Sequence, residues 1–221
     1  MWCIPVANAK FVAAMEHILD LYELPYNPQR PMVCFDETSK QLIGETRLPL
    51  PASPGQVLRY DYEYRRHGTR NLFLFFEPLA GWRHVEVTER RTKLDFAHQM
   101  RWLVDVAYPD AECLEVVLDN LNTHTYAALY EAFEPAQARR IARKLAFHYT
   151  PAHASWLNMA EIEFSVVMRK LGLRVPDEET LKRKVRAIVT ARNQAHSTVD
   201  WQFTTDGARI KLKRLYPSIP D

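Results

Sequence analysis

Residues 31–36 have the sequence PMVCFD and residues 113–119 have the sequence CLEVVLD, and these two stretches decide the expected fold. Each is a continuous apolar run that ends in an aspartate, which is typical of a strand buried on both faces of a sheet. A side chain directly after such a strand lies at the carboxyl edge of the sheet, where open α/β sheets bind their ligands. We therefore expect Asp36 and Asp119 to lie close together, although a loop or helix-capping role explains either aspartate taken alone.

A third group of carboxylates lies further along the chain. Glu161 and Glu163 belong to a stretch with helical spacing, so one of them can approach the two aspartates from a helix. Magnesium is a hard cation that prefers oxygen ligands, and two such ions about 4 Å apart assist both oxygens of an in-line phosphodiester displacement. The carboxylates therefore predict a two-ion magnesium site, in which manganese can take the place of magnesium.

The composition is that of an ordinary globular protein. The chain has 221 residues, of which 47% are hydrophobic and 25% charged, which is enough for one substantial domain and too apolar for a disordered chain. Lys and Arg number 29 against 27 Asp and Glu, so any contact with nucleic acid must come from local patches. No stretch has the length of a membrane span or the layout of a signal peptide. We expect a cytoplasmic protein without a membrane partner.

Other common catalytic motifs are absent from the sequence. It contains no G-x-S-x-G, G-x-x-x-x-G-K-[ST], G-x-G-x-x-G or H-E-x-x-H pattern. The histidines lack zinc-ligand spacing. Cys3, Cys34 and Cys113 have no CxxC spacing and are expected as small core residues. Acidic residues are therefore the best candidates for catalysis.

The hydrophobic periodicity predicts a mixed α/β sheet flanked by helices. Three antiparallel strands are expected beside Asp36, with one strand at residues 57–66 and a hairpin that turns at Pro78 to Gly81. The other expected elements are helices at residues 8–24, from Thr92 to Pro109, from Thr123 or Thr125 to Phe133, from Ser155, and from Asp177 to Gln194, and strands at 113–118 and 145–151. The expected division is an amino-terminal helix and linker at 1–30, a catalytic domain at 31–196 and a basic tail at 197–221.

Three strings carry a resemblance to a known family: CFDET at residues 34–38, VVLDNLNTH at residues 116–124 and YTPAHASWLNMAEIEF at residues 149–164. In this order they resemble the catalytic core of bacterial insertion-sequence transposases related to the mariner superfamily, which are DDE superfamily endonucleases. The resemblance implies a ribonuclease-H-like fold with Asp36 and Asp119 on neighbouring strands and a helical glutamate as the third magnesium ligand. It also implies cleavage of DNA at transposon ends, followed by transfer of the freed 3′-hydroxyl end into target DNA at the same site.

The register of the third ligand rests on the family pattern Ser-Pro-Asp-Leu-Asn-Pro-hydrophobic-Glu/Asp. Residues 154–161 of this chain are ASWLNMAE, in which Leu157 and Asn158 match the pattern and set its register on Glu161. The Pro-Asp pair of the pattern is replaced here. Glu163 stays open as an alternative, because helical spacing places both glutamates beside the same buried stripe.

Several residues near the expected site are candidates for contact with DNA. They are Lys40, Asn122, His124, His153 and Trp156, and for each a structural or solvated role is the alternative. Glu37 is expected on the opposite side of its strand from Asp36, in a surface or structural role. Clusters of basic residues around 139–144, 169–174, 182–186 and 209–214 are candidates for a phosphate-binding track, which would make binding weaken steeply with salt.

The resemblance implies partners and a location as well. Transposases of this kind act on paired ends, which predicts a homodimer or larger assembly on transposon and target DNA, at the bacterial nucleoid. The helix-turn-helix region that precedes the catalytic core in the family is not recognisable, since the one expected amino-terminal helix has no second helix at short spacing. An inactive or truncated remnant that only binds DNA or partner subunits, and a nuclease without strand transfer, stay open as alternatives.

Overall fold

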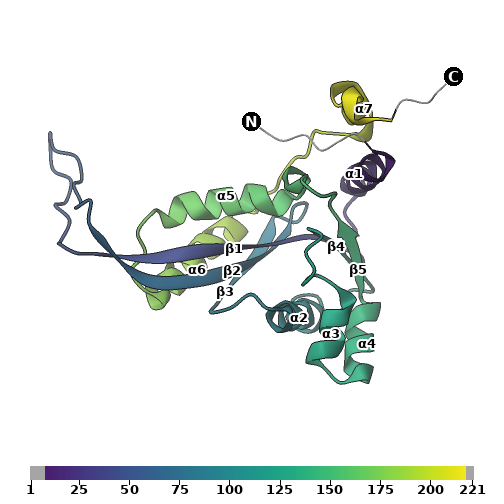
Figure 1. Ribbon diagram of the computed structural model, residues 1–221, viewed down its shortest axis with the longest axis horizontal. Helices are drawn as coiled ribbons and strands as arrows, with labels where there is room; N and C mark the ends of the chain where they lie inside the picture. Colours follow the sequence, from purple (N-terminus) through teal and green to yellow (C-terminus); the bar gives the residue numbers. More distant parts are fainter. Residues whose placement is uncertain (1–7, 218–221) are drawn as a thin grey trace.

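The protein folds around one sheet of five strands in the order β3-β2-β1-β4-β5 (Figure 1). The computed structural model describes residues 8–217, so Cys3 lies outside the described residues. The strands are β1 (Met32–Glu45), β2 (Tyr64–Glu77), β3 (Trp82–Thr88), β4 (Leu114–Leu118) and β5 (Leu145–Tyr149). Strands β1, β2 and β3 are antiparallel, whereas β4 and β5 run parallel to β1. The predicted mixed α/β sheet is confirmed, with the predicted hairpin between β2 and β3.

Helices cover both faces of the sheet and divide the interior into two hydrophobic cores. The helices that pack on the first core are α1 (Ala9–Tyr22), α5 (Met159–Leu171), α6 (Glu178–Gln194) and α7 (Thr205–Lys211). The helices that pack on the second core are α2 (Lys93–Trp102), a π-helical turn (Leu103–Ala107), α3 (Tyr126–Ala132) and α4 (Pro135–Arg143). Within β1, Cys34 belongs to the first core and Phe35 to the second. By the same alternation Asp36 points to the α5 face and Glu37 to the α2 face.

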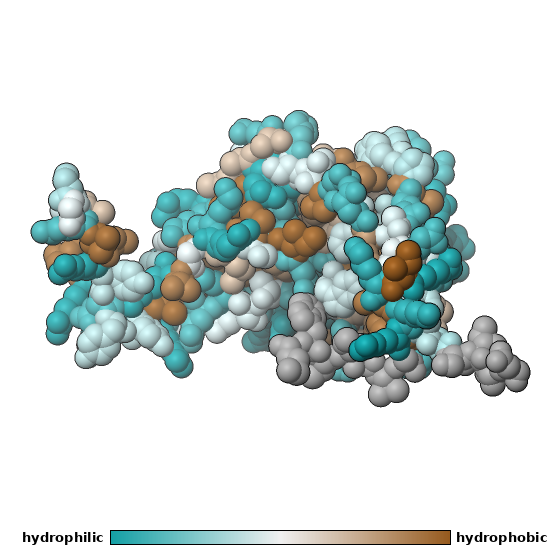
Figure 2. All heavy atoms as spheres, turned by 90° about the horizontal axis from the view of Figure 1, so that it is seen from above, coloured by the Kyte–Doolittle hydropathy of each residue, from teal (hydrophilic) through white to brown (hydrophobic). Residues whose placement is uncertain are grey.

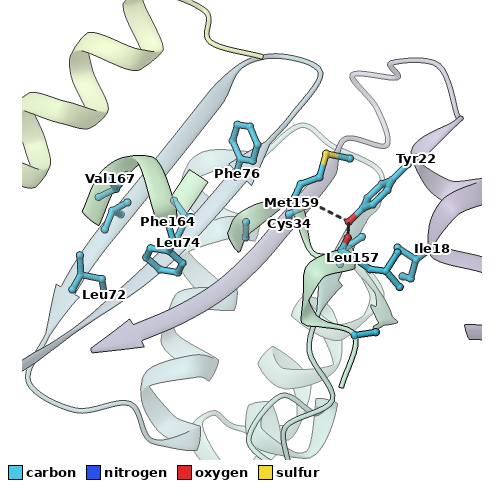
Figure 3. Close-up of a cluster of buried hydrophobic side chains, with 14 of the residues drawn as sticks. Ile18, Tyr22, Cys34, Leu72, Leu74, Phe76, Leu157, Met159, Phe164 and Val167 are labelled. Atoms are coloured by element: carbon cyan, nitrogen blue, oxygen red, sulfur yellow. Dashed lines mark hydrogen bonds between the residues drawn. The ribbon is translucent and has the colours of Figure 1, made fainter. Parts of the chain in front are cut away.

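Helix α1 is anchored to the segment that leads into α5. Its side chains Met15, Ile18 and Tyr22 are buried in the first core, and the Tyr22 hydroxyl donates a hydrogen bond of 2.6 Å to the carbonyl oxygen of Leu157 (Figure 3). The division of the chain at residues 30 and 196 stays a prediction. Within residues 8–217 no helix has the length and apolar character needed to cross a membrane.

Strand β1 is longer than predicted, so Asp36 lies within it and not after its end. Its pairing with β4 ends at Cys34, but its pairing with β2 continues to Glu45. From Ser39 onward one face of β1 is open, since Ser39 and Gln41 are exposed while Lys40 and Leu42 are buried. A strand covered on one face alternates and does not need a continuous apolar run.

Two other boundaries differ from the prediction. Helix α5 begins at Met159 and not at Ser155, because residues 155–157 form a 3₁₀ turn and Asn158 is the N-cap. The predicted strand at 57–66 is regular only from Tyr64 onward. Helix α4 was not among the predicted elements, and it starts with a proline in its first turn, where the missing N–H costs nothing.

Strands β1 and β2 extend past the rest of the sheet as an arm, whose tip comprises residues 46–63 (Figure 1). Arg174, in the segment after α5, holds the base of this arm. Its guanidinium forms an ion pair with Glu45, donates to the carbonyl oxygen of Asp61 at 2.6 Å, and lies 4.5 Å from the ring centroid of Tyr60. Brown, apolar patches lie at the projecting end of the molecule in Figure 2. The exposed large side chains toward the tip are Leu48, Leu50, Val57, Leu58 and Tyr62.

Candidate metal-binding active site

Asp36 and Asp119 emerge at the same edge of the parallel pair formed by β1 and β4. The pairing of these strands ends at Cys34 and Val117, so each aspartate stands two residues beyond the last paired position. Because parallel strands advance in the same direction, equal offsets bring the two side chains to one place. The sequence predicted that each aspartate directly follows a strand. Asp119 does so, whereas Asp36 lies within its strand.

Glu161 is brought to the same place by the amino-terminal end of α5. It lies in the first turn of this helix, three residues after the N-cap Asn158. The Asn158 side chain accepts a hydrogen bond from the backbone N–H of Ala160 at 3.1 Å and donates one of 2.8 Å to the carbonyl oxygen of Phe35. The first turn of α5 is therefore fastened to the residue that precedes Asp36.

The carboxyl of Asp36 experiences strong negative charge. Burial raises its pKa to about 7 from 3.8, and the nearby charges of Asp119 and Glu161 raise it further, although a hydrogen bond from the backbone N–H of Glu37 opposes the shift. Burial and neighbouring negative charge both disfavour the ionised form of this carboxyl. Carboxylates crowded in this way suit a hard divalent cation such as magnesium. As oriented here, no set of His, Cys, Asp or Glu side chains within residues 8–217 forms a ready-made metal cage of three or more.

Glu163 points away from the two aspartates into an internal ion-pair cluster. Its side chain is 1% exposed, and its two carboxylate oxygens accept hydrogen bonds of 2.6 and 2.7 Å from Arg192 of α6. The Nε of Arg83, on β3, lies 3.1 Å from the same carboxylate. Glu163 thus links α5 to α6 and β3 and is already neutralised. Of the two alternatives left by the sequence, Glu161 is the one whose charge acts on Asp36.

Two of the residues expected to contact DNA, Lys40 and His124, are buried, and their contact with DNA stays a prediction. Lys40 is 8% exposed, and its ammonium group donates a hydrogen bond of 2.6 Å to the carbonyl oxygen of Gly172. His124 is completely buried, with its ring nitrogens next to carboxylates of Asp119 and Glu37. Burial lowers the pKa of His124, but the hydrogen bonds with these carboxylates outweigh burial and raise it to about 9. Neither side chain is offered to a ligand from solution.

The other candidates lie at the surface. Asn122 and His153 are exposed, and His153 has a left-handed backbone with φ 63°. Trp156 is half-buried, with its ring centroid 5.9 Å from that of Phe203. His153 also lines a cleft of about 470 Å³ between the start of α1 and the loop after β5, together with Lys10 and Asn120, the residue that follows Asp119. The cleft is lined by the residue next to Asp119 in the chain, but not by Asp36, Asp119 or Glu161 themselves.

Sequence reasoning missed two residues of the site. Asn158 was used only as a motif match, and its role as a link to β1 depends on the approach of α5 to the sheet. Glu37 was expected at the surface or in a structural role; its side chain is only 6% exposed and meets His124. The VVLDNLNTH string indicates the contact between Asp119 and His124, because these residues stand five positions apart in one loop. No sequence spacing indicates that His124 also reaches Glu37 on another strand.

Comparison with known proteins agrees with this fold. The chain is similar to the Mos1 transposase paired-end complex with the left transposon end, with 17% identity, coverage of 97% of this chain and 63% of that one, and a TM-score of 0.57. It is similar to the Mos1 strand transfer complex, with 15% identity, coverage of 88% and 59% of the two chains, and a TM-score of 0.59. It is also similar to the Mos1 transposase catalytic domain with raltegravir and Mg, with 13% identity, coverage of 94% and 92%, and a TM-score of 0.50. No curated protein matches. At these identities the likeness shows a shared ribonuclease-H-like fold, and the chain spans about 63% of the length of the Mos1 chain in the paired-end complex.

A family profile covers the part of the chain that carries the site. It matches residues 31–182, which include every strand of the sheet and α5, and hence Asp36, Asp119 and Glu161. The profile describes a DDE superfamily endonuclease and spans more than half of the chain. The chain therefore belongs to the DDE superfamily endonucleases.

Proposed function

We propose that the chain is the catalytic domain of a transposase, which cleaves DNA at transposon ends and joins the freed ends to target DNA. The observation that carries the proposal is the electrostatic coupling of carboxylates from three elements: burial raises the pKa of Asp36 on β1, and the charges of Asp119 after β4 and Glu161 on α5 raise it further. Membership of the DDE endonucleases supports DNA cleavage. The strand-transfer step is supported by likeness to a protein whose structures include complexes with a transposon end and a strand transfer complex.

Asp36, Asp119 and Glu161 are the proposed ligands of magnesium. Related Mos1 complexes are described with Mg and with Mn, which supports either cation here. When bound, two such ions supply charge stabilisation for the attacking and leaving oxygens of the phosphodiester. The chain supplies the carboxylate oxygens from three places: Asp36 within β1, Asp119 directly after β4, and Glu161 on a helix whose first turn is tied to β1 by Asn158.

DNA is proposed to approach the carboxylates along the face that contains the cleft beside Asp119. Lys10 and His153 can donate to phosphate, Asn120 and Asn122 can hydrogen-bond to phosphate or sugar, and Trp156 stays a candidate contact at the rim. Lys40 and His124 are not part of this proposed surface, because both are buried. A phosphate contact should make binding depend on salt.

We further propose that the chain assembles as a dimer or larger complex on DNA. The arm formed by β1 and β2 exposes apolar side chains far from the core, with Leu48 93%, Val57 77% and Tyr62 86% exposed. Contiguous exposed apolar side chains of this kind mark interaction surfaces. The arm has a defined base at Arg174, so it presents these side chains in a fixed direction.

The test is cleavage of supercoiled plasmid by the purified chain with magnesium or manganese. We expect nicking by the wild type and its loss in Asp119→Asn and Glu161→Gln. The matched controls are Asp110→Asn and Glu179→Gln, which remove exposed carboxylates away from the site and should nick as the wild type does. Covalent joining of an oligonucleotide with a free 3′-hydroxyl to the plasmid then separates a strand transferase from a simple nuclease. A folded wild type that cuts with neither metal would disprove the proposal.

A further inference from the structure

We infer that His124 and Glu37 form a buried support that fixes the orientation of Asp119. Because this inference takes Asp119 to be a metal ligand, it rests on the proposed function. The role is one of positioning: neither side chain reaches the surface, and each acts through Asp119. Two neighbouring strands contribute to the support, since Glu37 lies on β1 and Asp119 follows β4.

The support is a chain of two hydrogen bonds. Nδ1 of His124 lies 2.6 Å from Oδ1 of Asp119, and Nε2 lies 3.2 Å from Oε2 of Glu37. An ionised carboxylate only accepts hydrogen bonds, so the ring nitrogens are the donors. Oδ1 of Asp119 is the oxygen that contacts the buried histidine, while the Asp119 side chain as a whole is 33% exposed. One oxygen is used to hold the side chain and the other is left for a cation.

The imidazole itself has little freedom to move. Its centroid lies 5.3 Å from the ring of Phe35 and 4.8 Å from the ring of Phe96. The hydroxyl of Tyr149 donates a hydrogen bond of 2.7 Å to the carbonyl oxygen of His124, which fixes the backbone at the same residue. The direction of Asp119 is therefore set by packed aromatic side chains through the histidine.

The position of Glu37 argues for a role in orientation. Its side chain is 6% exposed on the α2 face of β1, among aromatic residues, and besides His124 it has one charged neighbour, Arg91, at 3.9 Å. Burying a carboxylate is costly unless it is paired, and a paired buried charge adds little to stability compared with an apolar residue. A stable core alone does not require a glutamate at this place. The glutamate is needed if the imidazole ring of His124 must be held in one orientation by hydrogen bonds at both of its nitrogens.

Partners of this kind behind a metal ligand commonly change metal affinity by about 10- to 100-fold. The first measurement is Mn²⁺ binding by the full chain, followed by the electron paramagnetic resonance of free Mn²⁺, which reports binding without catalysis. We expect His124→Phe to weaken binding at least tenfold, because the ring still fills the space while both hydrogen bonds are lost. His124→Asn, which keeps a donor toward Asp119 alone, should fall between His124→Phe and the wild type. The matched control is His98→Phe, on the exposed side of α2.

A second set of variants separates positioning from folding. In the Asp119→Asn background, His124→Phe should cause no further loss of Mn²⁺ affinity, because the support then has no ligand to orient. Glu37→Gln provides the same test from the far end of the chain of hydrogen bonds, and it also serves if His124→Phe does not fold. Independent, additive losses in the double variant would overturn the inference.

The outcomes distinguish this inference from the proposed function. If Asp119→Asn weakens Mn²⁺ binding but folded His124→Phe and Glu37→Gln bind as the wild type does, the support has no role in positioning and the proposed function stands. If Asp119→Asn binds Mn²⁺ as tightly as the wild type, or if the wild type does not bind Mn²⁺, Asp119 is not a ligand and both fail.

Discussion

The side-chain amide of Asn158 hydrogen-bonds to the backbone carbonyl oxygen of Phe35 over 2.8 Å, and this contact ties the start of a helix to the strand that bears Asp36. The same side chain caps the helix by accepting a hydrogen bond from the backbone N–H of Ala160. One residue thus decides both where α5 begins and how far Glu161 lies from β1. The pair Leu157-Asn158, identified in the sequence only as a motif match, has this physical role.

Replacing Asn158 with alanine should therefore affect stability and cleavage together. We expect a loss of about 1–3 kcal/mol in the free energy of unfolding, from the cap and the buried hydrogen bond, and a fall in metal-dependent nicking. Urea unfolding and the plasmid assay measure the two effects. Asp177→Ala is the matched control, since it removes the N-cap of α6 away from the site. Equal nicking by the two variants would show that the link to Phe35 does not matter for the site.

The two glutamates of α5 should behave in opposite ways. Glu163→Gln leaves Arg83 and Arg192 without their buried partner, and breaking a buried ion pair in this way costs about 3–5 kcal/mol. Glu161→Gln removes one of several crowded negative charges, so the metal-free protein should keep its stability or gain some, while nicking is lost. Thermal unfolding in the presence of a chelator compares the two variants. A strongly destabilising Glu161→Gln would contradict the assignment.

The raised pKa of Asp36 makes the metal-free protein less stable as pH rises. The folded state binds this proton more tightly than the unfolded state, so Asp36 favours folding at acid pH. This stabilisation is lost as the pH rises from about 4 to about 7, because the pKa of Asp36 is about 7 in the folded state and 3.8 ordinarily. The charged groups that act on Asp36 are Asp119 and Glu161, together with Glu37 on the other face of the strand. Asp36→Asn should flatten this part of the profile by about 2–4 kcal/mol, as urea unfolding at pH 5 and pH 7 in a chelator would measure. An unchanged profile would mean that Asp36 titrates normally.

His124 predicts a second pH window, at higher pH. Its pKa is raised to about 9 from 6.5, so the stability that it contributes as an imidazolium is present below about pH 6.5 and is lost as the pH rises through 9. Urea unfolding at pH 7 and pH 9.5 should therefore show a decline that is absent in His124→Phe. Asp36→Asn serves as the control, since it should change the lower window and leave this one in place.

The exposed tip of the arm should affect assembly without affecting the fold. Leu48→Ser combined with Val57→Ser changes two exposed side chains, so the free energy of unfolding should stay within about 0.5 kcal/mol of the wild type. The sedimentation of the chain on a DNA duplex should shift toward the monomer. Ile210→Ser, on α7 and 80% exposed, is the control for a general loss of surface hydrophobicity. Unchanged sedimentation of the arm variant would exclude the tip from the proposed assembly.

The sequence predicted the sheet well because its signals are local. Apolar runs, the turn at Pro78 to Gly81 and the helix start at Thr92 each act within a few residues, and the hairpin and the start of the helix formed as expected. The length of β1 was missed because one face of its second half is exposed, and a strand with one covered face has no continuous apolar run.

The functions of single polar side chains were harder to predict, because they depend on which distant element lies opposite. Lys40 lies close to Asp36 in sequence, yet the loop after α5 covers it. Glu161 and Glu163 lie on one helix, beside the same buried stripe. They differ in that Glu163 forms ion pairs with Arg83 of β3 and Arg192 of α6. A histidine next to acidic residues can be either a ligand contact or a buried support, and its exposure decides between them.

The ion pair between Glu163 and Arg192 has a consequence for synthesis of the chain. A growing polypeptide leaves the ribosome from its amino end, so β1 with Asp36 and β4 with Asp119 are available early. The contact of Glu163 with Arg192, near the end of α6, forms only after those later residues have emerged. On the proposed assignment, the helix that bears the third carboxylate therefore gains its last buried ion pair only in a chain synthesised through α6.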